Sequence, residues 1–313
     1  MATLLLVLLL AFGAMLLGLF LFDRLWPSAS AALALRLARR RAGLMEGEET
    51  VEGQLMPYLV GGEGEPLLLV HGFGGDKDNF TPIAGLLTRH YRVLIPDLPG
   101  FGDAGRDPGI SYHIADQVQR LVAFLDTLGL ARVHLGGSSM GGFIAAELAA
   151  RHPERVASLW LLDAAGTAAA HDSAVVQAAL QSNEFPLLIR EVGEYDRLMS
   201  LTMARPPFFP HGLKLTLARR GVADYALHRR IIDQFGKESP LLEKQFHRIE
   251  VPALIVWGES DQILSPKGAQ ALHALLPHSE VQMMPGIGHL PMVEAPRATA
   301  RRYLRFRAKL LEV

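Results

Sequence analysis

The chain has 313 residues, of which 50% are hydrophobic and 20% are charged, and its mean hydropathy is +0.20. This composition excludes disordered, collagenous and coiled-coil proteins, because it is too apolar and too evenly charged for them. Lys and Arg total 31 against 32 Asp and Glu, so the protein has no overall charge that attracts nucleic acid, and none is expected as a partner. With no cysteine, disulfide scaffolds, thiolate metal sites and cysteine nucleophiles are excluded together.

A long apolar run lies at the N-terminus. Residues 4–22 contain no charged, amide or hydroxyl side chain, and at about 1.5 Å per helical residue they span roughly 28 Å, close to the hydrocarbon thickness of a bilayer. Asp23 and Arg24 end the run, and Trp26 follows at the level where aromatic rings meet lipid headgroups. Residues 1–27 are therefore predicted to form a transmembrane anchor.

Residues 28–48 are predicted to form a basic juxtamembrane helix and linker. Pro27 breaks the first helix, and Ser28 or Ser30 is expected to cap the second. Leu33 and Leu37 stand one helical turn apart, and arginines are expected on the opposite side, at Arg36, Arg39, Arg40 and Arg41. This pattern is typical of a helix that lies on anionic lipid.

The alternative for this segment is a cleaved signal peptide, for which Ala29-Ser30-Ala31 supplies a small-residue cleavage site. Two features favour an uncleaved anchor: nothing basic precedes Leu4, and the run is longer than the ~7–15 residues of a signal peptide. Arginines follow the span and none precedes it, so the positive-inside rule would place the body in the cytoplasm. Ala14 and Gly18 form a small-residue pair that could help two spans pack as a homodimer.

Beyond residue 50, short apolar runs alternate with helical patterns. Strands are predicted at 66–70, 92–95, 132–135, 156–162, 253–257 and 281–284, with one or two more between 51 and 60. Helices are predicted at 114–128, 140–150 and 267–276. Such alternation indicates a parallel, doubly wound sheet. It stops between about 163 and 248, where the sequence predicts a helical insertion.

The candidate nucleophile is Ser139, at the centre of Gly137-Ser138-Ser139-Met140-Gly141, which matches G-x-S-x-G. The motif follows a predicted strand and opens a predicted helix, the setting in which a serine is raised on a tight turn. The frame selects this serine, because centring the motif on Ser138 would put Met140 where the second glycine belongs. A Gly/Ser loop joining a strand to a helix is the structural alternative.

A serine hydroxyl needs a base and a group that orients the base. Asp261 follows the strand predicted at 253–257, and His289 follows the strand predicted at 281–284. These residues stand in the order Ser, Asp, His, and each comes after the C-terminal end of a strand, where sites form in parallel sheets. Asp163, which ends the strand predicted at 156–162, is a rival for the orienting role.

Two backbone N–H groups are expected to stabilise the oxyanion. One is that of Met140, directly after the nucleophile. The other is that of Phe73, in the glycine-rich stretch Val70-His71-Gly72-Phe73-Gly74-Gly75. A phosphate-binding loop is the alternative for this stretch, but no Lys-Ser/Thr pair follows it.

Together, His71-Gly72-Phe73-Gly74, Asp97-Leu98-Pro99-Gly100-Phe101-Gly102, the serine motif, Asp261 and His289 resemble the α/β-hydrolase superfamily over about residues 50–313. The resemblance implies an α/β fold with a core of residues 49–163 and 249–313 and a helical cap of residues 164–248. It also implies Ser139 as nucleophile, His289 as base and Asp261 as orienter, with no cofactor or metal.

With its N-terminal span, the chain looks most like the bacterial single-pass membrane-anchored lipases of this superfamily, of the phospholipase A type. That resemblance implies hydrolysis of fatty acyl esters of membrane lipids, location in the bacterial inner membrane, and a periplasmic catalytic domain that dimerises through the membrane segment. The periplasmic location conflicts with the arginine count, and the resemblance is given the greater weight.

The cap residues Phe185, Leu188, Met199, Phe208 and Phe209 are candidates for binding the acyl chain, with packing inside the cap as the alternative. Three functions are kept open. The first is a serine hydrolase that releases fatty acid from membrane lipids. The second is a small-molecule esterase or C–C bond hydrolase of the same fold, for which a membrane anchor has no obvious use. The third is a non-catalytic receptor or scaffold, which need not keep all three triad residues.

Overall fold

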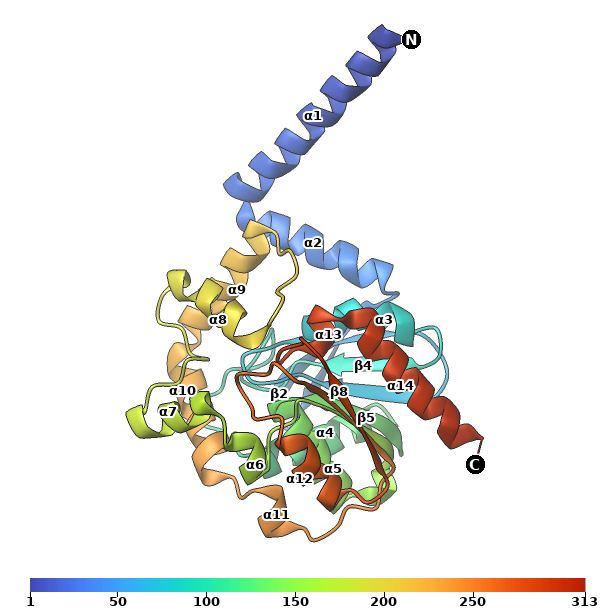
Figure 1. The fold of residues 1–313 in the computed structure, drawn as a ribbon, viewed down its shortest axis with the longest axis vertical. Helices are drawn as coiled ribbons and strands as arrows, with labels where there is room; N and C mark the ends of the chain where they lie inside the picture. The colour runs from blue at the N-terminus through green and yellow to red at the C-terminus, as the bar shows by residue number, and fades with distance from the viewer. Residues whose placement is uncertain (313) are drawn as a thin grey trace.

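The computed structural model describes residues 1–312 and shows an eight-stranded sheet between two layers of helices. A cap of helices covers one side of the molecule, and α1 projects alone from the body (Figure 1). The strands are β1 (Met45–Val51), β2 (Gln54–Gly61), β3 (Pro66–Val70), β4 (Arg92–Pro96), β5 (Val133–Ser138), β6 (Val156–Leu162), β7 (Ala253–Gly258) and β8 (Ser279–Met284).

The helices divide into those of the N-terminal segment, the sheet layers and the cap. The first group is α1 (Ala2–Leu25) and α2 (Pro27–Arg41). The sheet carries η1 (Lys77–Phe80), α3 (Thr81–Leu87), α4 (Ile114–Thr127), α5 (Met140–Arg151), η2 (Pro153–Arg155), α12 (Gly268–Leu275), α13 (Pro291–Glu294) and α14 (Pro296–Leu311). The cap contains α6 (Ala168–His171), α7 (Ala174–Ser182), η3 (Val192–Glu194), α8 (Tyr195–Thr202), α9 (His211–Ala223), α10 (Tyr225–Asp233), η4 (Gln234–Glu238) and α11 (Leu242–Gln245).

The sheet order is β1-β2-β4-β3-β5-β6-β7-β8. β2 runs antiparallel to both β1 and β4, and the strands from β4 to β8 are parallel. This confirms the predicted mostly parallel, doubly wound sheet. The cap is inserted between β6 and β7, as the resemblance implied. The parallel order places the C-terminal ends of β5 to β8 side by side.

Two apolar clusters hold the sheet to its helices. One packs α4, α5 and α12 against one face, around fully buried side chains such as Phe124, Phe143 and Trp257. The other packs α3 and α14 against the opposite face, where Trp160 stacks on Tyr303 with ring centroids 4.4 Å apart. With both faces covered, the central strands are continuous apolar runs, which explains why they were predictable from sequence.

The N-terminal half of the sheet was predicted less well. The sheet begins at Met45, earlier than the core boundary predicted at residue 49, because β1 is an edge strand whose charged residues interrupt the apolar pattern. The predicted caps of α2 were also wrong. The helix is capped at Trp26 with Pro27 as its first residue, and the Ser30 hydroxyl donates to Asp23 at 2.6 Å.

The outward face of α2 differs from the predicted arrangement. Leu33, Arg36, Leu37 and Arg40 are all exposed and follow helical i, i+3, i+4, i+7 spacing, so apolar and basic side chains share one stripe. Arg39 was expected among the outward arginines but turns inward, where its Nε donates to Asp78 at 2.8 Å. The remaining face of α2 packs on α9 and α3.

The helix α1 has no buried residue, and it is long and apolar enough to cross a membrane. It is linked to the cap at its C-terminal end by Asp23. The Asp23 carboxylate accepts the N–H groups of His211 and Gly212, each at 2.9 Å, and so caps the N-terminus of α9. The candidate span is therefore attached directly to the first turn of a cap helix.

Candidate active site

Ser139 stands at the sharp turn between β5 and α5. Its backbone has φ 55° and ψ −120°, a conformation that a non-glycine residue adopts only when the surroundings impose it. The backbone of Ser139 is held by its N–H bond to Leu162 O and by bonds from Phe143 and Ala165 to its carbonyl. This turn lifts the hydroxyl to the C-terminal edge of the sheet.

The glycines of the motif allow that turn to pack. A Cβ at Gly137 would lie 2.1 Å from the carbonyl oxygen of Gly141, and one at Gly141 would lie 2.2 Å from that of Val70. Both obstacles are backbone atoms and cannot move aside like a side chain. The spacing of the motif is therefore a steric requirement of this turn.

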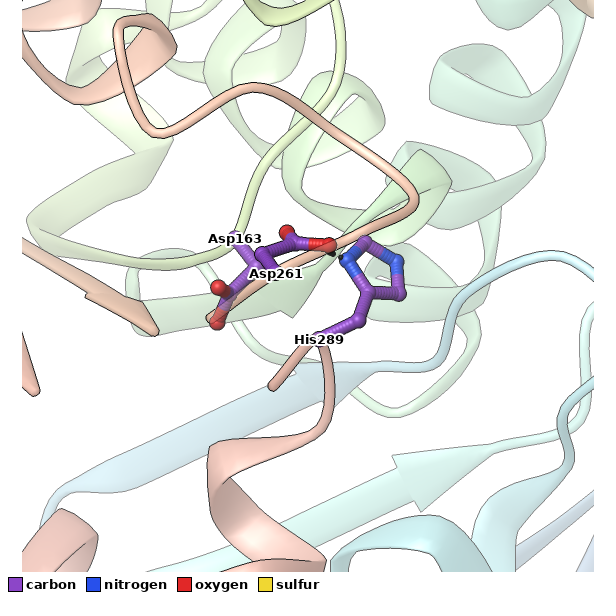
Figure 2. A group of neighbouring side chains, drawn as sticks. All are labelled: Asp163, Asp261 and His289. Carbon is purple, nitrogen blue, oxygen red and sulfur yellow. Dashed lines mark hydrogen bonds and ion pairs between the residues drawn. The ribbon is translucent and has the colours of Figure 1, made fainter. Parts of the chain in front are cut away.

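His289 and Asp261 meet at the same edge. His289 Nδ1 lies 2.8 Å from Asp261 Oδ2, and the second ring nitrogen is turned away from Asp261 (Figure 2). Both side chains are buried. Asp261 Oδ1 accepts the N–H groups of Ile263 and Leu264, which fixes Oδ2 toward the ring. The backbone N–H of His289 donates to the backbone carbonyl of Thr202 in the cap at 2.8 Å, so cap and core both position the residue that carries the imidazole.

The rival orienter, Asp163, lies beside the pair without bonding to the ring in Figure 2. Its Oδ1 accepts Gly258 N–H at 2.8 Å, and its Oδ2 has no partner among the described residues. Burial, together with the adjacent Asp261 carboxylate, raises the pKa of Asp163 well above its usual range. The raised pKa favours the protonated form of Asp163, and Asp261 is the carboxyl group in contact with His289.

The predicted oxyanion donors lie at the start of α5 and in the loop after β3. Met140 is the first residue of α5, where a helix leaves its N–H without an internal partner. Phe73 N–H likewise donates no hydrogen bond within residues 1–312. Gly72, which precedes Phe73, approaches so closely that a Cβ there would lie 3.1 Å from Ser139 Cβ. Both N–H groups are thus available at the turn that carries Ser139.

Ser139 and His289 line one cavity of about 160 Å³ between the cap and the sheet. Its lining includes apolar cap side chains, namely Leu187, Leu188, Ile189, Leu198, Met199 and Leu217. It also includes a polar set, called the polar wall below, with Asp76 and Asn79 from the core and Arg220, Asp224 and His228 from the cap side. The site therefore offers both apolar contacts and polar groups to a substrate.

The polar wall is held by ion pairs that sequence reasoning missed. Arg220 from α9 bonds Asp76 at 3.1 Å and Asp103 at 2.7 Å, so it joins the cap to two core loops. Burial, reinforced by the neighbouring Asp78 and Asp97, raises the pKa of Asp76 to about 7. Asp76 was detectable by its position directly after the glycine-rich loop, but no sequence signal points to Arg220.

A second cavity of about 480 Å³ adjoins the first. It lies beneath α2, whose Leu35 and Ala38 form part of its wall, and it extends along α3 and α9. Residues that line both cavities include Tyr195, Met199 and Leu217. The second cavity thus shares lining residues with the active-site cavity and reaches the helix that follows the candidate span.

The five cap residues predicted to bind an acyl chain do not all line a cavity in the structure. Leu188 and Met199 line the active-site cavity, and Phe209 lines the second cavity with Met199. Phe185 instead lies against the Arg229 guanidinium, 5.1 Å from the ring centroid, and lines neither cavity. Phe208 is 91% exposed and also lines neither. Phe185 and Phe208 thus lie outside both cavities, and their role in binding an acyl chain stays a prediction, since apolar character alone does not fix which way a cap side chain points.

By distance alone, Asp163, Asp261 and His289 could hold a metal ion, because one donor atom from each lies within 4.8 Å of the others. The arrangement fits proton handling better than metal binding. A carboxyl group whose pKa is raised is a weaker ligand, and His289 Nδ1 is already engaged by Asp261. The chemistry that this arrangement supports is activation of a serine hydroxyl by an oriented imidazole.

These features are those of a serine hydrolase with an α/β sheet. The model of the alpha/beta hydrolase fold family matches residues 65–296, and the chain belongs to this family. Lipase 1 of Psychrobacter immobilis is 38% identical over 262 residues, which is 82% of each chain. Monoacylglycerol lipase ABHD6 of Mus musculus is 28% identical over 91% of this chain and 89% of its own.

Among solved structures, a bacterial membrane phospholipase A described as a virulence factor superposes with a TM-score of 0.89. It is 37% identical and covers 100% of both chains, so the similarity includes the N-terminal helices. The predicted family and the prediction of an enzyme of the carboxylic ester hydrolase type are thereby confirmed. The receptor or scaffold interpretation is not supported.

Proposed function

We propose that the protein is a membrane-anchored lipase that releases fatty acids from membrane lipids through an acyl-enzyme. Ser139 Oγ attacks the acyl carbonyl while His289 Nε2 takes its proton, and the N–H groups of Phe73 and Met140 stabilise the oxyanion. His289 then protonates the leaving alcohol. It next activates a water molecule that releases the acid from Ser139. Asp261 holds the ring in the tautomer that accepts the proton at Nε2.

The observation that carries the lipid assignment is the apolar cavity beneath α2, which adjoins the active-site cavity. An acyl chain entering along α2 would pass Phe209 and Met199 before its ester reached Ser139. A small water-soluble substrate has no use for such a passage. The names of the relatives, which include lipases, a monoacylglycerol lipase and a phospholipase A, support the same substrate class.

The polar wall bears on which lipid headgroups the site accepts. The Arg220 guanidinium already bonds Asp76 and Asp103, so a substrate phosphate would have to displace carboxylates. Hydroxyl groups of glycerol would instead find both donors and acceptors on this wall. We therefore expect monoacylglycerol to be hydrolysed faster than an anionic phospholipid of the same chain length.

The test is fatty acid release by the full-length protein in vesicles that carry monoacylglycerol, lysophospholipid or diacyl phospholipid, beside short p-nitrophenyl esters in solution. Ser139→Ala is the control for nucleophilic catalysis. Activity on the vesicle lipids that disappears in Ser139→Ala supports the proposal. Activity confined to short soluble esters would refute the lipid assignment while leaving the hydrolase assignment intact.

We further propose that α1 spans the bacterial inner membrane once and that the body faces the periplasm. A reporter that is active only in the periplasm, fused after Val313, tests this orientation. If a reporter that works only in the cytoplasm is active at this position and the periplasmic reporter is not, the proposed orientation is overturned. The body then faces the cytoplasm, as the positive-inside rule predicts. Homodimerisation through α1 is tested by crosslinking in membranes, where Ala14→Leu with Gly18→Leu is expected to abolish the crosslinked dimer.

A further inference from the structure

The loop of residues 205–210 places an aromatic ring in an unusual position. Phe208 is 91% exposed, the most exposed large apolar side chain of the described cap residues. Pro206, Pro207 and Pro210 surround it and restrict the backbone, so the loop holds the ring outward with little freedom to fold back. Aromatic rings are enriched in the headgroup region of membranes, where such an outward position suits them.

The loop lies next to the residues that join the cap to α1. The residue after Pro210 is His211, whose N–H donates to the Asp23 carboxylate at the C-terminal end of α1. Three residues of chain reach at most about 11 Å, so the Phe208 backbone lies within that distance of His211. The headgroup region on each side of a bilayer is about 5–8 Å deep. Phe208 is therefore tethered within roughly 11 Å of His211, the residue that joins the cap to the C-terminal end of α1.

The surroundings of the loop have the character of a lipid interface. Trp26 is 58% exposed immediately after α1, and Leu33 and Leu37 are exposed on the outward stripe of α2. Arg36 and Arg40 lie on the same stripe and complement anionic headgroups. The loop and α2 face the same cavity, since Phe209 and Leu35 of α2 both line it.

We propose that Phe208 inserts into the headgroup region of the leaflet next to α1, so that the cap itself is docked on the membrane. The proposal rests on the membrane anchoring of α1 and concerns a contact made by the cap, 183 residues beyond the last residue of α1. The protein then has two attachments to the bilayer, the span and the cap loop. Phe208 faces lipid while its neighbour Phe209 faces the cavity that leads to the active site.

The test uses the absence of cysteine from the chain, which makes an introduced thiol a unique labelling site. Phe208→Cys carries an environment-sensitive nitrobenzoxadiazole label in the full-length protein, in liposomes that contain anionic lipid. Leu180→Cys in α7 and Leu311→Cys in α14 are matched controls, since both side chains are exposed (47% and 75%) and the helices α7 and α14 lie away from α1 in Figure 1. All three substitutions are at the surface, so folding is expected to be preserved.

When liposomes are present, the emission of the label at position 208 should rise several-fold and shift to the blue. A lipid carrying a nitroxide near the headgroup should quench this emission. The labels at 180 and 311 should show neither effect. A label at 208 that behaves like the two controls would overturn the proposal. The proposal would also be overturned if the rise in emission vanished in vesicles that hold one protein chain each. The rise would in that case have come from contact with a second copy of the chain. The readout does not involve hydrolysis, so its outcome is separate from that of the proposed function.

Discussion

Replacing Asp261 by Asn distinguishes the two carboxyl groups near His289. In the wild type, Asp261 Oδ1 accepts the N–H groups of Ile263 at 2.8 Å and Leu264 at 3.0 Å, and Oδ2 faces His289 Nδ1 at 2.8 Å. In Asp261→Asn, the amide oxygen keeps the two backbone bonds, so the amide nitrogen faces the ring. That nitrogen donates to Nδ1 and forces the ring proton onto Nε2, where it prevents proton transfer from Ser139.

We expect kcat to fall by about 10⁴, or roughly 5 kcal/mol of transition-state stabilisation, as in other serine triads that receive this substitution. Asp163→Asn is the matched control. Because burial and Asp261 raise the pKa of Asp163 and so favour its protonated form, the amide resembles that form, and the loss should stay below about tenfold, or 1.4 kcal/mol.

The assay is steady-state hydrolysis of a short p-nitrophenyl ester, with thermal unfolding to verify that both variants are folded. Equal losses in Asp261→Asn and Asp163→Asn, or a greater loss in the latter, would refute the assignment of Asp261 as orienter.

Three further predictions concern the cavities, the ion pairs and the nucleophile turn. Leu217→Trp should lower hydrolysis of long-chain monoacylglycerol by at least about tenfold and leave hydrolysis of a butyrate ester nearly unaffected, because Leu217 lines both cavities. Equal losses on both substrates would contradict the proposed route of the acyl chain through the second cavity. Asp76, with its pKa raised to about 7, binds a proton more tightly in the folded protein than in the unfolded chain, so its contribution to stability is lost as pH rises from about 4 to 7. The unfolding midpoint should therefore fall less between pH 5 and pH 8 in Asp76→Asn than in the wild type, and parallel changes would count against this reasoning. Gly141→Ala should destabilise by about 3 kcal/mol or more, because its Cβ meets the Val70 carbonyl at 2.2 Å, whereas Gly193→Ala, with nothing within 4 Å, should be near neutral in a denaturation measurement.

The parts of the site that follow buried strands were predictable from sequence. β3 and β6 match the predicted ranges, and Ser139, Asp261 and His289 each follow the end of a parallel strand. Continuous apolar runs bounded by glycine identify such strands, and the parallel order then brings their C-terminal ends together. The chain order of the three residues was therefore enough to predict that they converge.

The contacts of the cap were not predictable in the same way. Arg220 meets Asp76 across 144 positions of sequence, and Asp23 meets Gly212 across 189, so neither pair leaves a local pattern. Phe208 and Phe209 are adjacent and chemically identical, yet one is exposed and the other lines a cavity. Side-chain direction in an irregular loop depends on tertiary packing, which composition and periodicity do not encode.

The central claim is that Ser139 carries the acyl group of a membrane lipid during turnover. The direct measurement is mass analysis of acid-quenched full-length protein, taken during hydrolysis of monoacylglycerol in vesicles. The account predicts a peptide in which Ser139 bears the fatty acyl group, and no such peptide in Ser139→Ala. Fatty acid release that continues undiminished in Ser139→Ala, with no acylated serine at any time, would contradict it.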